Sequence, residues 1–450
     1  MYDLIFLILY LTPFVILYFY RDDRHPRIFT ISAANTLMLF YLVYDHVGLA
    51  FIYSHKTIER LNGVAVNREV LLLLALYTNI LVLAYIITGC LNANLRCKIR
   101  DIHIHTIQNV NIRWFAILLL FIVTTFFAYI KFSSNSPLQL LLAGKAAAAG
   151  AARVAQVSHN ATAILGIKHS YVNILFVILN FVGILFLIKY MASKKNKYLV
   201  MYFIYIAIAG LFSFSNVSKG FMVTILLQLW FVYSAVYHKG MVLNRFVIVP
   251  FFAASVAIAV FSAWFMGNET IDFLYPLKRL IMGNLYPQYV MVDHFNFNNL
   301  LYGTSAPSWF SLGLHEQVNT EILAWKLIFP DSPKDIFYTA PSSFVSEAHA
   351  NFHFIGVIVI AFLVFGALRL IDHLITRIHS PLIFLTMLIF LSLYFSSLSV
   401  SGAINLTVDY YLWGVLLFVF FAYKVTLLAS KSPCPTYEGG LKNTELKHFS

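Results

Sequence analysis

Residues 339–368 read TAPSSFVSEAHANFHFIGVIVIAFLVFGAL, a polar run that passes directly into an apolar one. Apolar runs of about 20 residues recur along the chain, and a helix of that length matches the roughly 30 Å hydrocarbon core of a bilayer. Only helices and closed barrels satisfy their backbone hydrogen bonds in lipid. Because the hydrophobicity is continuous rather than alternating, these runs predict helices instead of barrel strands.

The composition agrees with a bilayer as the solvent. Of 450 residues, 60% are hydrophobic and 11% are charged, which excludes a disordered chain and disfavours a soluble globule. Cys90, Cys97 and Cys434 have no metal-ligand spacing, so we expect neither a zinc site nor a structural disulfide. The sequence contains no phosphate-binding loop and no HExxH motif. It therefore predicts neither a cofactor nor a metal.

The sequence predicts an all-α polytopic integral membrane protein with about eleven transmembrane helices, within a range of 10 to 14. The expected spans are 2–20, 31–53, 68–89, 114–132, 171–190, 198–214, 220–238, 246–267, 354–372, 381–398 and 405–428. Residues 1–430 would form one transmembrane catalytic domain. Residues 431–450, rich in Pro, Gly and Ser, would form a disordered cytoplasmic tail.

The distribution of basic residues predicts the orientation. One set of alternate connections, including RDDRHPR (21–27) and RLIDHLITR (369–377), contains 19 of the 31 lysines and arginines. The positive-inside rule places that set in the cytoplasm, with the N-terminus outside and the C-terminus inside. The inverse topology would instead put the acids of RDD in the first outer loop, where many lipid-sugar-dependent glycosyltransferases keep their catalytic acid.

The predicted orientation leaves two long loops on the outer, periplasmic side. The first, about 133–170, carries Lys145 and Arg153 but no acidic residue, so it is a candidate anion site. Arg153 could bind phosphate oxygens in a bidentate manner, with Lys145 as a point charge. The alternative is that these residues are solvated charges beside anionic lipid headgroups.

The second long loop, about 268–353, begins with an amphipathic segment. Its apolar stripe consists of Leu277, Leu280, Ile281, Leu285 and Tyr289. This pattern predicts an interfacial helix that lies along the bilayer surface and forms a wall for a lipid-phosphate pocket. Lys278 and Arg279 lie off the stripe, where they either bind phosphate or extend to the headgroups.

The polar run at 342–353 is the candidate catalytic segment. Ser343 or Ser346 could cap a helix, and Glu347 and Asn351 would share one face of it. Half-desolvated at an outer helix start, Glu347 is a reasonable general base. The alternative is that Glu347 is an N-terminal helix charge and that the histidines are interfacial anchors.

Two further sites carry charge near the outer ends of spans. Lys219 precedes Gly220 at the start of a helix, where a lysine and free N–H groups favour an anion, although a simple turn lysine fits equally well. Asp45 and His46 lie near the outer end of the second span, and charges at membrane depth usually face a cavity or each other.

Three motifs together resemble the bacterial oligosaccharide repeat-unit polymerases, or O-antigen polymerases of the Wzy type. SNVSKGFMVTILL (215–227) resembles the family's Lys/Arg-Gly helix start, and LKRLIMGN (277–284) resembles the segment that opens its large loop. Glu347, Asn351, Phe352 and Gly356 resemble its Glu-x-x-x-Asn-Phe-x-x-x-Gly entry into the following helix. Span number, aromatic content and two large outer loops extend the resemblance over most of the chain.

The resemblance implies an enzyme that transfers a growing polymer from undecaprenyl pyrophosphate to the non-reducing end of a new lipid-linked unit. The departing pyrophosphate needs fixed positive charge and the acceptor hydroxyl needs a base. The residues expected at the pyrophosphate are Arg279, Arg153, Lys278, Lys219 and Lys145. The expected base is Glu347, with His349 or His315 as substitutes. No nucleotide or metal is expected, because the pyrophosphate leaving group supplies the energy.

The expected partners are undecaprenyl-pyrophosphate-linked oligosaccharides, the lipid bilayer and a chain-length regulator protein, with no nucleic acid. The expected location is the bacterial inner membrane, with the active site facing the periplasm. Two alternatives stay open. One is an O-antigen ligase or a polyprenyl-phosphate-sugar glycosyltransferase. The other is a flippase or transporter of lipid-linked oligosaccharide, which should show repeated halves and a central charged cavity.

Overall fold

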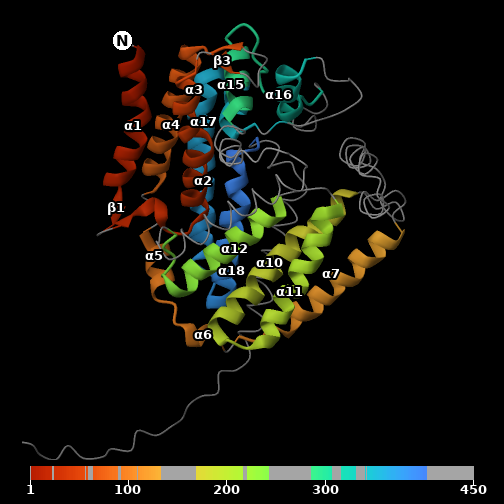
Figure 1. Ribbon diagram of the computed structural model, residues 1–450. Helices are drawn as coiled ribbons and strands as arrows, with labels where there is room; N and C mark the ends of the chain where they lie inside the picture. The colour runs from red at the N-terminus through yellow and green to blue at the C-terminus, as the bar shows by residue number, and fades with distance from the viewer. Residues whose placement is uncertain are drawn as a thin grey trace, which may run out of the picture.

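The computed structural model describes residues 2–22, 25–55, 57–58, 64–89, 93–108, 110–132, 169–215, 220–242, 285–306, 316–330, 340 and 342–402 (Figure 1). Over these residues the fold is helical, and its strands are two-residue hairpin pairs. β1 (Arg21–Asp22) pairs with β2 (His25–Pro26), and β3 (Thr57–Ile58) pairs with β4 (Val64–Ala65).

The described helices fall into three groups in chain order. The first group is α1 (Tyr2–Phe19), η1 (Arg27–Phe29), α2 (Ala33–Tyr41), the π-helical η2 (Leu42–His46), α3 (Val47–Tyr53), α4 (Arg68–Gly89), α5 (Ala93–Arg100) and α6 (Ile104–Gln108). The second group is α7 (Arg113–Phe132), α10 (His169–Ser193), α11 (Asn196–Ser215) and α12 (Gly220–Tyr237). The third group is α15 (Leu285–His294), α16 (Thr320–Ile328), α17 (Phe344–Ile375), α18 (Pro381–Ser396) and η6 (Ser397–Ser399).

Within the described residues, six helices are long and apolar enough to cross a membrane. They are Tyr2–Phe19, Ala33–Tyr53, Arg68–Gly89, Leu175–Ser193, Phe344–Ile375 and Pro381–Ser399. Three shorter apolar helices are Arg113–Phe127, Asn196–Leu211 and Thr224–Tyr237. The predicted all-helical membrane fold is therefore confirmed. The number of about eleven spans stays a prediction, because 246–267 and 405–428 lie outside the described residues.

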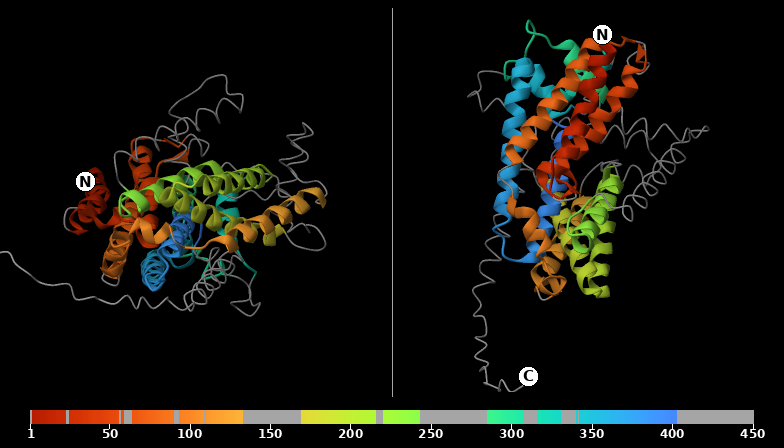
Figure 2. Two further views of the ribbon diagram at one scale, coloured as in Figure 1. Left: turned by 90° about the horizontal axis from the view of Figure 1, so that it is seen from below. Right: turned by 90° about the vertical axis from the view of Figure 1, so that its left-hand side faces the viewer.

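Helix α17 runs the height of the molecule beside α4, and α2 and α18 pack against it (Figures 1 and 2). It begins at Phe344, earlier than the predicted span at 354, because the polar run 344–351 is helical and buried as well. At its other end, Arg369 and Asp372 lie inside the helix and are buried. Both residues fall within the predicted span 354–372, although they were also counted with the basic connection 369–377.

The connections predicted to be cytoplasmic gather at one end of the molecule, where β1, α5 and α6 lie (Figure 1). The Ile31 N–H donates to the Gly240 carbonyl at 2.9 Å, which joins the link after α1 to the link after α12. The Gln108 side chain donates to the Ala192 carbonyl at 2.7 Å, which joins α6 to the end of α10. These contacts agree with the predicted alternation of connections, while the side of the membrane stays a prediction.

Lys189 on α10 is buried, at 1% exposure, and joins α10 to the end of α6. Its ammonium donates to the backbone carbonyls of Ile107, Gln108 and Val110 at 2.8, 2.8 and 2.7 Å. These carbonyls belong to the end of α6 and the residues after it, which have no helical donors left. The lysine thus serves as the cap of α6.

Replacing Lys189 with Met should lower the free energy of unfolding by about 3 kcal/mol or more, because three carbonyls would lose a charged donor in a buried site. The measurement is thermal unfolding of the purified protein in detergent. Lys195→Met is the matched control, since Lys195 is exposed on the following turn. Equal midpoints for the two variants would contradict this cap.

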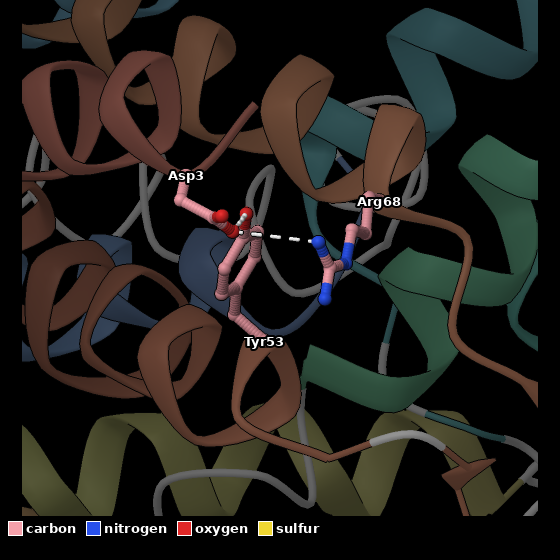
Figure 3. Close-up of polar contacts among 3 residues, drawn as sticks. All are labelled: Asp3, Tyr53 and Arg68. Carbon is pink, nitrogen blue, oxygen red and sulfur yellow. Dashed lines mark hydrogen bonds and ion pairs between the residues drawn. The ribbon is translucent and has the colours of Figure 1, made fainter. Parts of the chain in front are cut away.

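At the opposite end, an exposed cluster joins α1 to α3 and α4 (Figure 3). The Tyr53 hydroxyl donates to Asp3 Oδ1 at 2.5 Å, and Arg68 Nη1 lies 3.4 Å from the same oxygen. The side chains of Arg68 and Asp3 are 57% and 74% exposed, so this ion pair contributes little to stability. The cluster fastens α1 to its neighbours and presents no enclosed site.

Helix α15 is the described part of the segment predicted to lie along the bilayer surface, and that position stays a prediction. Leu285, Gln288 and Tyr289 are buried at 1%, 0% and 1% exposure, because α15 packs on α4, α16 and α17. Burial raises the pKa of Tyr289, whose phenol oxygen accepts the Asn67 N–H at 2.6 Å. Leu285 and Tyr289 of the apolar stripe therefore contact protein. Residues 273–284 lie outside the described part of the chain.

Candidate functional site

The polar run at the start of α17 is the described part of the predicted site, and it contains Glu347 and His349. The other predicted site residues lie outside the described residues; they are Lys145, Arg153, Lys219, Lys278, Arg279 and His315. Their roles, and their distances from Glu347, stay predictions.

Ser343 caps α17, as the sequence predicted. Its backbone is extended (φ −68°, ψ 160°), and its hydroxyl accepts the Ser346 N–H at 3.4 Å. Every residue from Phe344 to Asn351 is buried, and Glu347 is 2% exposed. The sequence suggested that Glu347 would be half-desolvated, whereas protein encloses it and the rest of this run almost completely.

The helix breaks immediately after this run. Phe352 (φ −141°, ψ 24°) and His353 (φ 53°, ψ −147°) leave helical geometry, and the positive φ of His353 is rare for a residue with a side chain. Such a conformation costs about 1–3 kcal/mol and persists only where the surroundings enforce it. Strained backbone of this kind is concentrated at functional sites, which makes the break a marker for one.

The turn at 301–305 supplies the hydrogen bonds that the break removes. Leu301 N–H donates to the Ala350 carbonyl at 2.8 Å, and Tyr302 N–H donates to the Asn351 carbonyl at 3.2 Å. Gly303, with φ 87°, donates its N–H to Asn351 Oδ1 at 2.8 Å. The segment 301–303 is thus docked on the break through its backbone N–H groups.

Asn351 connects three parts of the site with one carboxamide. Its Oδ1 accepts from Gly303, while its Nδ2 donates to Ser305 Oγ and to the Glu347 carbonyl, both at 2.8 Å. The side chain is 2% exposed, so each of these bonds replaces water that cannot enter. Glu347 and Asn351 share one helical face, as their spacing predicted, so the Asn351 side chain can reach the Glu347 carbonyl one turn earlier.

The imidazole of His349 joins α4, α17 and the end of α15. Its Nε2 lies 3.0 Å from the Phe295 carbonyl, which can only accept, so Nε2 carries the hydrogen. Its Nδ1 then accepts the Tyr77 hydroxyl at 2.6 Å. Both ring nitrogens are occupied by protein groups. The geometry favours a role in positioning, and the substitute-base role stays a prediction.

Replacing Tyr77 with Phe should lower the free energy of unfolding by about 1–3 kcal/mol, because His349 Nδ1 would stay buried without a donor. Thermal unfolding of the purified variants measures this loss. Tyr202→Phe is the matched control: Tyr202 is 3% exposed, and its hydroxyl has no hydrogen-bond partner among the described residues. A loss in the control as large as in Tyr77→Phe would rule out the histidine as the cause.

The Glu347 carboxylate lies against Gly402, which follows η6. A Cβ added at Gly402 would stand 2.9 Å from Glu347 Cδ, closer than real Cβ atoms approach other atoms, and 3.3 Å from Oε1, which is an unusually tight contact. Only a glycine leaves room for this carboxylate. The sequence analysis missed Gly402, because its loop carries no charge and its contact with Glu347 spans 55 positions of the chain.

Asp45 on η2 and Gln288 on α15 form a buried polar pair where the two helices meet. Asp45, on π-helical η2, is 1% exposed and accepts the Gln288 Nε2–H at 2.5 Å through Oδ1. The neighbouring His46 is held by the Tyr10 carbonyl (2.8 Å) and the Thr78 hydroxyl (3.0 Å). Asp45 thus faces a neutral amide instead of the cavity or the second charge that its position suggested. Gln288 was not foreseen, because the stripe pattern placed its helix at the bilayer surface.

The inner end of α17 carries a separate buried network. Asp372 accepts the N–H groups of Ala33 and Ala34 at 2.9 and 3.5 Å and so caps α2. Arg369 donates to Asn35 Oδ1 at 3.1 Å and lies over the Tyr85 ring at 4.7 Å. These side chains join α2, α4 and α17 at the end of the molecule that carries the basic connections.

Comparisons with models of known protein families, with characterised proteins and with solved structures gave no match to this chain. The site therefore has to be interpreted from its own geometry. That geometry is a buried carboxylate beside a strained helix break, held by the large outer loop.

Proposed function

We propose that this chain is a membrane glycosyltransferase that polymerises undecaprenyl-pyrophosphate-linked repeat units into O-antigen or a related surface polysaccharide. The observation that carries the proposal is the position of the Glu347 carboxylate. This carboxylate is buried, stands at a break that costs energy, and lies on the end of α17 that contacts α15, opposite the basic connections (Figure 1). Strain and buried charge are retained where chemistry needs them.

In the proposed reaction, the acceptor sugar hydroxyl attacks the anomeric carbon of the polymer on its lipid carrier. The new glycosidic bond forms while the bond to the pyrophosphate oxygen breaks, and undecaprenyl pyrophosphate leaves with the electron pair. Glu347 takes the proton of the hydroxyl. Arg279 and Arg153, assisted by Lys278, Lys219 and Lys145, would stabilise the pyrophosphate charge.

The test is a reaction of the purified protein in liposomes with lipid-linked repeat units, without nucleotide. We expect a ladder of products that differ by one repeat unit. Transfer of a single chain to an added lipid A core would identify a ligase instead. Unchanged repeat units in every arm would contradict polymerisation.

A lipid-linked oligosaccharide transporter is the second candidate, and two observations favour it. Helix α17 is discontinuous at Phe352 and His353, and buried ionisable residues (Asp45, Arg369 and Asp372) lie inside candidate spans. Transporters use both features at their substrate sites. Movement of the lipid-linked unit across the vesicle bilayer without any change in its length would support this candidate over the polymerase.

A further inference from the structure

The Asp45–Gln288 pair leaves two buried oxygens without a donor. Gln288 Nε2 donates to Asp45 Oδ1, but neither Asp45 Oδ2 nor Gln288 Oε1 has a hydrogen-bond partner among the described residues. The two residues are 1% and 0% exposed. Buried acceptors almost always find a donor, and each one left without a donor costs about 1–3 kcal/mol.

Among the residues that the structure describes, none supplies a counter-charge to Asp45. Gln288 on α15 is its hydrogen-bond partner, and the titratable groups that it influences on its own helix are the phenols of Tyr41 and Tyr44. On α4, the Tyr77 hydroxyl is already committed to His349. No ion pair to Asp45 occurs in the described part of the chain. An ionised carboxylate here would be a buried charge without compensation, which proteins avoid.

One proton would give both Asp45 Oδ2 and Gln288 Oε1 a hydrogen-bond partner. If Asp45 Oδ2 carries a proton, it can donate to Gln288 Oε1 while Gln288 Nε2 donates to Asp45 Oδ1. The acid and the amide then form a cyclic pair that is neutral and fully hydrogen-bonded. We propose that Asp45 is a proton-binding site, and that its bound proton latches α15 onto the transmembrane helices.

The proton on Asp45 would also affect the candidate site, because α15 leads to the residue that holds His349. Gln288 is in the middle of α15, and the chain leaves α15 toward Phe295, whose carbonyl holds His349. Loss of the proton would remove one of the two bonds and place an uncompensated charge beneath α15. The helix would then separate from η2, and the support of His349 would loosen with it. This latch does not depend on the reaction that the site performs.

Infrared difference spectroscopy tests the proton directly on the full-length protein at neutral pH. We expect a protonated-carboxyl C=O band that Asp45→Asn removes, and that Gln288→Leu shifts because its hydrogen-bond partner is gone. Asp293→Asn is the matched control, since Asp293 is an exposed carboxylate on the same helix. It should leave the band unchanged. The absence of any band dependent on Asp45 would overturn the proposal.

Stability against pH provides an independent readout. An Asp in an unfolded chain ionises near pH 4, so a folded state that keeps the proton loses stability as pH rises above that value. The side-chain amide of the Asp45→Asn variant can form the same cyclic pair without a titrating proton. The folding equilibrium constant of Asp45→Asn relative to wild type should rise by up to about tenfold per pH unit between about pH 5 and the pH at which the folded protein releases the proton. A flat ratio, or an Asp45→Asn protein that does not fold, would mean that the carboxylate is ionised in its site.

Discussion

Replacing Glu347 with Gln should reduce polymer formation by about 100-fold or more while the protein accumulates at its normal level. The amide has the same shape and can occupy the same buried space, but it cannot accept the acceptor proton. Loss of a general base typically costs a factor of 10²–10⁴. The measurement is the rate of ladder formation by equal amounts of purified protein on lipid-linked repeat units.

The control for this substitution is Glu316→Gln, the same change at an exposed acid of the large outer loop. It should leave the rate within about twofold. If Glu347→Gln retained wild-type activity, Glu347 would not be the base, and its burial would have to be explained by packing alone. If both variants lost activity equally, the effect would not be specific to the buried carboxylate.

Replacing Gly402 with Ala should also remove most of the activity. The added methyl group would stand 2.9 Å from Glu347 Cδ, so either the carboxylate or the loop after η6 has to move. A displacement of about 1 Å at a reacting group can lower a rate by about 100-fold. Gly366→Ala is the matched control, since a Cβ at that position on α17 meets nothing within 4 Å.

A second-site change separates the clash from general damage to the fold. Adding Glu347→Asp to Gly402→Ala shortens the acid by one methylene and frees space for the new methyl group. The double variant should recover the thermal midpoint that Gly402→Ala loses. No recovery would show that Gly402 matters for another reason, such as the backbone conformation of its own loop.

The discontinuity of α17 explains how a polar run can open a membrane helix. A broken helix leaves carbonyls without donors, and lipid cannot supply them. Here the turn at 301–305 supplies the donors, and Asn351 holds that turn in place. The turn at 301–305 is therefore part of the structure of α17. Conditions that undock the loop should also release the strain stored at His353.

Sequence periodicity and composition predicted much of this fold, because helix propensity and span length are local properties. The second span was predicted at 31–53 and is formed by Ala33–Tyr53, and the Ser343 cap follows from a serine before an apolar run. The break at Phe352 could not be predicted in this way, since nothing local excludes a continuous helix there. It is stabilised by Leu301 and Tyr302, about 50 positions earlier in the chain.

In the candidate site too, the residues with a local sequence signal could be predicted and those that depend on distant contacts could not. Glu347 and Asn351 were recognised because polar residues beside an apolar run are locally conspicuous. Gly402 and Gln288 were not, because their importance lies in contacts with Glu347 and Asp45 on distant segments. The protein contacts of Leu285 and Tyr289 on α15 could not be predicted from the apolar stripe, since lipid and protein surroundings select the same residues.

The most direct test of the central claim is photocrosslinking with a lipid-linked repeat unit that carries a photoreactive group beside its pyrophosphate. The purified protein should be labelled in peptides that contain Arg153 or Arg279 and in the segment around Glu347, and unlabelled substrate should compete for all of them. This result would place the pyrophosphate beside the proposed base. Competable labelling confined to the other end of the molecule, near Lys98 or Arg369, would contradict a site built on the start of α17.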